Sequence, residues 1–285
     1  MAFCSNCGTQ MDDSQEVCPS CGTARAASGG SPAIPFAPPV AASEYGAVNE
    51  AQVRVGIDLE PPVQQRWTIL IRLILLIPLF IVGFFIALAG LFAAIGAWFA
   101  SLFTGRVPDG IQAFISGVVR FLGNILAYQY FVVPEWPGIP FNPAPSDQVT
   151  VDIDHVDLNR AAVFFRLILA IPASIVNSVL SYGALVISVV MWVWGVITGQ
   201  ENRIFHQGMA LVVRYQMRFY AYFFLLSPTQ PWTGLLGDEV VDDQAPGIAG
   251  GPKSERFVVL KDARTLVIVM LVVGAVLSVI VRSTS

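Results

Sequence analysis

The feature that most constrains this chain is a long apolar run from Trp67 to Thr104. Arg72 is its only charged residue and lies near its N-terminal end, with Arg66 just before the run. A helix that crosses the roughly 30 Å hydrocarbon core of a bilayer needs about 20 apolar residues. This run is longer than that, so it predicts a membrane segment rather than a helix in the core of a soluble domain.

The pattern occurs twice in the chain. The segment from Arg166 to Pro172 repeats the segment from Arg72 to Pro78 at an offset of 94 residues (166 − 72 = 94). At the same offset, Trp98 matches Trp192, Thr104 matches Thr198, Arg120 matches Arg214, and Tyr128 matches Tyr222. The sequence therefore predicts a duplicated α-helical membrane module, with repeat 1 at residues 51–145 and repeat 2 at residues 146–236.

Composition supports a membrane protein and limits the classes of function. Only 13% of the residues are charged, against 55% hydrophobic, whereas soluble domains carry about 25% charged residues. The net charge of −4 provides no global attraction for nucleic acid, so no nucleic-acid partner is expected. The two histidines, His155 and His206, have no nucleophile–base spacing, and we do not expect an enzyme.

Each repeat is predicted to begin with a strand. Residues 53–58 and residues 149–154 alternate apolar and polar side chains, as half-buried strands do. Residues 257–260 form a possible third strand before the last apolar run. Because all three precede an apolar run, we expect them to meet in one small sheet at one membrane face.

The long apolar run contains no clear turn signal. A single helix, kinked or bent near Pro78, is therefore the preferred interpretation. The alternative is a tight helical hairpin broken near Gly90, with the second copy broken near residues 181–183.

A return helix is expected after each long run, at residues 111–133 and 203–226. Its polar residues recur every fourth position, which keeps them on one helix face. Arginine within lipid is costly, so this face should meet protein, a wet cavity or phosphate head groups, or the helix should lie in the interface. No acidic residue lies within the apolar helices to neutralise it. We expect Arg120 and Arg214 to face a groove between the repeats, and the candidate ligand-binding residues are Arg120, Arg214, Arg218, Tyr128 and Tyr222.

All four cysteines lie in the first 21 residues, as two Cys-x-x-Cys pairs that are each followed by glycine. Such pairs predict a tetrahedral structural zinc site rather than disulfides or free thiols. The ligands would be Cys4, Cys7, Cys18 and Cys21. The segment resembles the N-terminal zinc-ribbon family, which implies a small β-hairpin module over residues 1–25 that contacts protein or nucleic acid.

The repeated module also resembles a family. Its pattern is a strand, Arg-Leu-x-Leu-x-Ile-Pro, an apolar run to Trp-Phe and Thr-Gly-Arg-x-Pro, and an amphipathic helix with Arg and Tyr. This is similar to a bacterial, largely actinobacterial, membrane-protein family of unknown function. Repeat 2 has Gln200 and Asn202 where repeat 1 has Arg106 and Pro108. The resemblance implies an architecture and no activity.

The remaining segments and the charge pattern predict a topology. Residues 26–50 read as a flexible linker, residues 237–263 as an acidic Gly/Pro linker, and residues 264–282 as a C-terminal transmembrane helix. Basic residues precede each apolar run, which places all three starts on the cytoplasmic face. We therefore expect five crossings and parallel repeats about an axis along the membrane normal, with the N-terminus cytoplasmic and the C-terminus outside.

Two functions fit these features. The first is a non-enzymatic membrane scaffold or accessory subunit, whose cytoplasmic zinc ribbon binds a partner protein while the repeats contact lipid. The second is a transporter or channel-like protein for an anion or lipid head group, with the arginine stripes at the repeat interface. Proteoliposome flux that depends on Arg120 and Arg214 would favour the second.

Overall fold

The computed structural model describes residues 2–3, 10–11, 53–62, 66–137, 149–154, 157–232, 234–241 and 257–284. The chain divides into two units, Met1–Glu50 and Ala51–Ser285. In the first unit, β1 (Ala2–Phe3) pairs antiparallel with β2 (Gln10–Met11). The four cysteines, the predicted linker at residues 26–50 and His155 lie outside the described residues.

The second unit is built on two long helices. Helix α1 spans Arg66–Thr104, and helix α4 spans Arg166–Thr198 after the short helix α3 (Arg160–Phe164). Each long run is thus a single helix that keeps its internal proline, Pro78 or Pro172. The hairpin alternative is wrong.

The return helices follow as α2 (Asp109–Gln129) and α5 (Arg203–Phe223), and the chain ends in α6 (Lys261–Thr284). Helix α5 starts where the Asn202 side chain accepts a hydrogen bond from the Ile204 amide. Helices α1, α2, α4 and α6 are the four described helices that are long and apolar enough to cross a membrane. Helix α5 is not among them, and the expected topology with five crossings stays a prediction.

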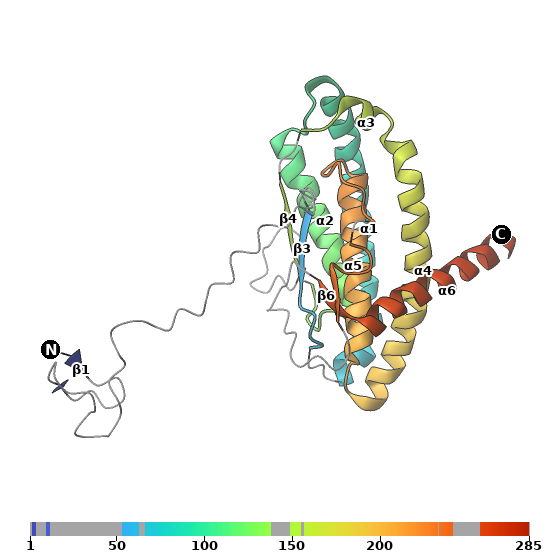
Figure 1. The fold of residues 1–285 in the computed structure, drawn as a ribbon. Helices are drawn as coiled ribbons and strands as arrows, with labels where there is room; N and C mark the ends of the chain where they lie inside the picture. The colour runs from blue at the N-terminus through green and yellow to red at the C-terminus, as the bar shows by residue number, and fades with distance from the viewer. Residues whose placement is uncertain are drawn as a thin grey trace. The chain divides into compact units, whose positions relative to one another are not determined.

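The elements of this unit form three layers (Figure 1). Strands β3 (Val53–Ile57) and β4 (Val149–Ile153) make an antiparallel pair that packs on α2 and α5. Helices α2 and α5 contact each other and form the middle layer, and α5 is the most buried helix. Helices α1 and α4 form the outer layer, on the side of α2 and α5 away from the strands.

Reciprocal contacts relate the two repeats by a pseudo-two-fold axis. The Trp98 indole donates to the carbonyl of Val163 (2.9 Å), and the equivalent Trp192 donates to the carbonyl of Ile69 (3.1 Å), which is equivalent to Val163. The end of each long helix therefore lies beside the start of the other, and α1 and α4 run antiparallel (Figure 1). The axis passes across the long helices and through all three layers.

The same axis passes through the inner layers. In the sheet, Val55 faces Val151, its equivalent in the other strand at an offset of 96 residues (151 − 55 = 96), since the strands are shifted by two residues relative to the helices. In the middle layer, Gly123 of α2 packs against Met217 of α5, its counterpart in the other repeat. Pairing of the first two predicted strands is thus confirmed, and it joins the repeats directly.

The third predicted strand takes a different partner. Strand β6 (Val258–Leu260) pairs in parallel with β5 (Glu239–Val241), in a sheet separate from β3 and β4. The expectation of one sheet from three strands is therefore wrong. Residues 239–241 supply the partner, although their acidic, glycine-containing surroundings favoured a linker, and α6 begins three residues earlier than predicted.

Helix α6 crosses α4 at two glycines. A Cβ atom at Gly183 would overlap the carbonyl of Met270, and a Cβ at Gly274 would overlap the carbonyl of Val179. Close backbone approach at small residues is the usual way in which helices associate inside a membrane, where apolar surface alone gives little drive to pack.

We expect Gly274→Leu to separate α6 from α4, because the added side chain has no room against the Val179 carbonyl. In mild detergent, disulfide cross-linking between cysteines placed at Tyr182 and Ser278, which line one notch between these helices, should fall at least several-fold. Gly96→Leu is the matched control, since a Cβ there meets only ordinary contact. Equal cross-linking in both variants would contradict this packing.

Candidate functional site

A buried arginine links the start of each long helix to the end of its return helix. In repeat 1, Arg72 is fully buried, and its Nη2 donates to the carbonyls of Val133 (3.0 Å) and Pro134 (3.3 Å). Its guanidinium lies 4.4 Å from the ring centre of Tyr128 and 4.5 Å from that of Phe131. Carbonyl oxygens and aromatic faces thus solvate a charge that lipid would not.

Repeat 2 builds the same clamp. The Nε of Arg166 donates to the carbonyl of Tyr222 (2.9 Å), and Nη2 donates to the carbonyl of Ser227. The guanidinium lies 3.8 Å from the Tyr222 ring centre. Arg166, Tyr222 and Ser227 are the counterparts of Arg72, Tyr128 and Val133, so the duplicated sequence encodes a duplicated contact.

Three of the carbonyls that the clamps bind, those of Val133, Pro134 and Ser227, lie just after an unusual helix end. Phe131 and Leu225, at equivalent positions, have φ values of +64° and +66°, a left-handed conformation that glycine usually occupies at helix ends. In each copy the next amide bonds back into the helix, from Val132 to Ala127 and from Leu226 to Ala221. The clamp therefore fixes a defined chain reversal against the long helix.

Arg214 is neutralised by a carboxylate from outside the helices. Its Nη2 donates to both oxygens of Asp238, at 3.0 and 2.9 Å, and its guanidinium lies 4.3 Å from the ring centre of Phe257. Asp238 also accepts from the Phe257 amide (2.8 Å). Burial lowers the pKa of Arg214 and Asp238 opposes this shift, so the pair fastens the chain before β5 and β6 to α5.

Arg218 lies one turn further along α5 and belongs to the same cluster. Its guanidinium and that of Arg214 both lie beside Gly234, near Asp238. Burial, reinforced by the positive charge of Arg214, lowers the pKa of Arg218 to about 10, and Asp238 partly offsets this. Asp238 therefore interacts with two guanidinium groups on α5, and its removal should change the electrostatic stabilisation of both.

Arg120 has different surroundings from its counterpart. It is partly buried near the middle of α2, and its Nη2 lies 3.5 Å from the carbonyl of Val151 in β4. Arg120 and Arg214 thus contact separate elements, β4 and the segment before β5, and the expectation that both face one groove between the repeats stays a prediction. The apolar helices contain no acidic partner for Arg214, and its counter-ion, Asp238, lies in the segment after them.

Tyr128 and Tyr222 are brought to the clamps of Arg72 and Arg166, not to Arg120 and Arg214 as their spacing predicted. The signal that could have found this was the repeated arginine at the start of each long run. An arginine near the start of an apolar helix is repeated in both copies, at the same offset as the tyrosine. This shared repeat indicates that the arginine and the tyrosine contact each other.

A buried polar group also ties the sheet side to α5. The ring of His206 lies 3.0 Å from the Asp58 carbonyl, and its other nitrogen is 3.4 Å from Glu201. The neighbouring Gln207 accepts from the Leu260 amide (2.9 Å). His206 thus holds the segment after β3 and has the surroundings of a structural residue.

The predicted zinc ligands form a donor set that suits a structural zinc. Four thiolates in two Cys-x-x-Cys pairs would suffice for a tetrahedral site without an open position. In the sequence, Cys4 and Cys7 fall between the paired strands β1 and β2. Within the described parts of the chain, no group of three or more His, Cys, Asp or Glu residues could hold a metal.

The fold and these contacts define an integral membrane protein made of two copies of one helical module, with a separate N-terminal unit. The family model described as "Domain of unknown function (DUF4389)" matches residues 66–141 and 160–233, and the zinc-ribbon domain matches residues 3–24. The two DUF4389 matches cover just over half of the chain, which therefore belongs to that family. No curated protein and no solved structure matches the chain.

Proposed function

We propose that this protein is a non-enzymatic membrane scaffold, in which a zinc ribbon held at the bilayer by the repeats binds a partner protein. The ribbon and the repeats are separate units, as expected when one part anchors and the other recruits. Zinc ribbons with four cysteine ligands leave the metal no open position, so the ribbon would supply a surface rather than a catalytic metal.

The observation that carries the proposal is how the repeats use their buried cations. Arg72 and Arg166 donate to backbone carbonyls of their own repeat, and Arg214 donates to Asp238. These contacts hold helix ends and strands in place. They give the buried arginines a structural role, which suits a rigid anchor better than a path that moves an anion past them.

The ribbon should hold one zinc ion per chain, and Cys18→Ser should release it. Metal binding contributes about 10–16 kcal/mol to folding in such modules, so the first unit should lose its structure while the membrane unit persists. Metal analysis of protein purified without chelator measures this, with Ser20→Ala as the matched control. Protein that carries no zinc would contradict the assignment.

Recruitment is tested by purification in mild detergent from native membranes. Wild-type chain and Ser20→Ala should retain a stoichiometric partner that Cys18→Ser loses, with all three chains still in the membrane fraction. A partner retained equally by Cys18→Ser would place the binding surface on the repeats. If no partner co-purifies with any of the three chains, the scaffold proposal is wrong.

A further inference from the structure

We propose that the two repeats lie in the plane of the membrane, with the α1/α4 layer immersed in one leaflet, and that α6 alone crosses. In this arrangement α2 and α5 lie at head-group depth and the β3–β4 sheet lies in water. The inference concerns how the chain meets lipid and does not depend on any partner of the zinc ribbon.

The position of the sheet argues against upright repeats. Strand β4 lies beside the middle of α2, where Arg120 reaches the Val151 carbonyl. Asp152 is exposed on the outer face of that strand. Close by, Arg54 and Asp154 form an exposed ion pair with 3.3 Å between the Arg54 Nη2 and the Asp154 Oδ1. If α2 crossed the bilayer, these charges and the open edges of a two-stranded sheet would face the hydrocarbon core, which membrane proteins avoid.

On the opposite face of the same unit, α1 after Arg66 and α4 carry no exposed charge. Between Trp67 and Thr104 the single charged residue, Arg72, is fully buried, and residues 167–198 of α4 contain none. Large apolar side chains are exposed along the whole of α1, from Trp67 at 78% to Phe103 at 78%. Charge is thus segregated by layer, with the sheet charged and the α1/α4 layer apolar.

The length of α1 points the same way. A helix of 39 residues is about 58 Å long, whereas the hydrocarbon core is about 30 Å thick. An upright α1 would expose apolar side chains to water at one end or both. A helix that lies in the plane keeps every exposed side chain from Trp67 to Phe103 at one depth.

Helix α6 shows on which side the bilayer lies. It starts next to β6, contacts α5 near Gly208, and then crosses α4 at Gly183. Its C-terminal end projects past α4, away from β3 and β4 (Figure 1). Helix α6 therefore passes through the layers from the charged side to the apolar side.

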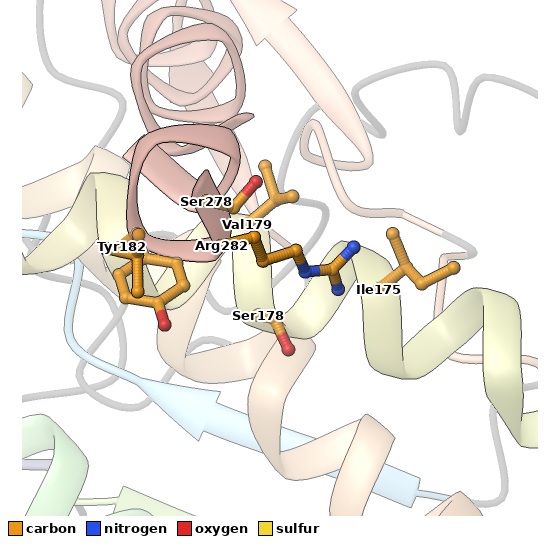
Figure 2. Close-up of a pocket in the computed structure, with 7 residues that line it drawn as sticks. Ile175, Ser178, Val179, Tyr182, Ser278 and Arg282 are labelled. Carbon is orange, nitrogen blue, oxygen red and sulfur yellow. The ribbon is translucent and has the colours of Figure 1, made fainter. Parts of the chain in front are cut away.

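The crossing also sets the depth of the layers. Figure 2 shows α4 beneath the end of α6, where Arg282 lies beside Ser178 and Ile175. From Lys261 to Arg282, α6 is about 32 Å long at 1.5 Å per residue, enough to cross the core once. The middle of α6, at Met270, packs on Gly183, so α4 lies within the acyl region. Arg282 still lies beside α4, and only the last residues of α6 reach the far interface.

The in-plane arrangement also satisfies the positive-inside rule, although α1 and α4 run antiparallel. The axis that relates the repeats passes through all three layers, so it becomes the membrane normal. Arg66 and Arg160, which precede the two long runs, then lie on the same face, as the positive-inside rule requires. Upright repeats would place one of them outside.

Equivalent turns at opposite ends of the long helices provide the test. Arg106 follows α1 and Gln200 follows α4, both are exposed, and they match at the repeat offset. Single cysteines would be placed at Arg106, Gln200, Asp152 or Ser283 in a full chain whose four cysteines are serine. A membrane-impermeant maleimide is then applied to intact cells and to inside-out vesicles.

We expect Arg106→Cys, Gln200→Cys and Asp152→Cys to be labelled from the cytoplasmic face only, and Ser283→Cys from the outside only. Labelling of Arg106→Cys and Gln200→Cys from opposite faces would overturn the proposal, as would an Asp152→Cys that reacts from neither face until detergent is added. Asp109→Cys is a second reporter of the first turn, should the Arg106 variant insert poorly.

Discussion

Replacing Arg166 by methionine should lower the free energy of unfolding of the membrane unit by about 2–4 kcal/mol. The change removes the cation–π contact with Tyr222, worth about 2 kcal/mol when desolvated, and takes the guanidinium donor from the Ser227 carbonyl, at about 1–3 kcal/mol, while the Leu225 amide still donates to the Tyr222 carbonyl. Relief of the buried charge offsets part of this loss. Unfolding by graded denaturing detergent in mixed micelles measures the difference.

The two repeats supply an internal comparison and a control. Arg72→Met should have a similar effect, because the equivalent clamp is removed from repeat 1. Arg106→Met should change the free energy by less than about 0.5 kcal/mol, since this side chain is exposed. If Arg72→Met and Arg166→Met were as stable as Arg106→Met, the clamps would not hold the fold together.

The second large effect is expected at Asp238. Asp238→Asn keeps the shape of the side chain but removes the charge that faces Arg214 and Arg218. Losing one partner of a buried ion pair costs about 3–5 kcal/mol, and because Asp238 is 31% exposed we expect about 2–4 kcal/mol. The same unfolding measurement reports it.

A double variant separates charge from shape at this pair. Arg214→Met combined with Asp238→Asn should recover part of the loss, because no unpaired guanidinium then remains at that position. Asp154→Asn is the matched control, since its pair with Arg54 is about half exposed and should contribute less than about 1 kcal/mol. Additive losses in the double variant would show that Asp238 acts through something other than Arg214.

The sequence predicted the parts of the fold that a repeated pattern encodes. The offset between Arg72 and Arg166 indicated two modules, the uninterrupted apolar run indicated one long helix, and alternation indicated strands β3 and β4. Each of these signals is local, or is a local signal found twice. The zinc ligands were likewise readable from their spacing, and the zinc-ribbon match covers them.

Contacts between distant segments could not be predicted in this way. Asp238 lies in a stretch whose composition is typical of a linker, and nothing local shows that it folds back on Arg214. Likewise, periodicity places Tyr128 on the face of Arg120, but the side chain reaches Arg72 on another helix. The antiparallel arrangement of α1 and α4 depends on how the middle layer packs, and no single helix encodes it.

The depth of side chains along α1 shows whether the α1/α4 layer lies within one leaflet. Nitroxide labels would be attached to single cysteines at exposed positions on this helix, and their depth measured from collisions with oxygen and with a water-soluble nickel complex. The positions are Ile74, Ile81, Leu88, Ile95 and Phe103. We predict one similar depth within the acyl region at all five. A profile that is deepest near Leu88 and returns to water at both ends, over about 40 Å of helix, would show that α1 crosses the bilayer and does not lie in its plane.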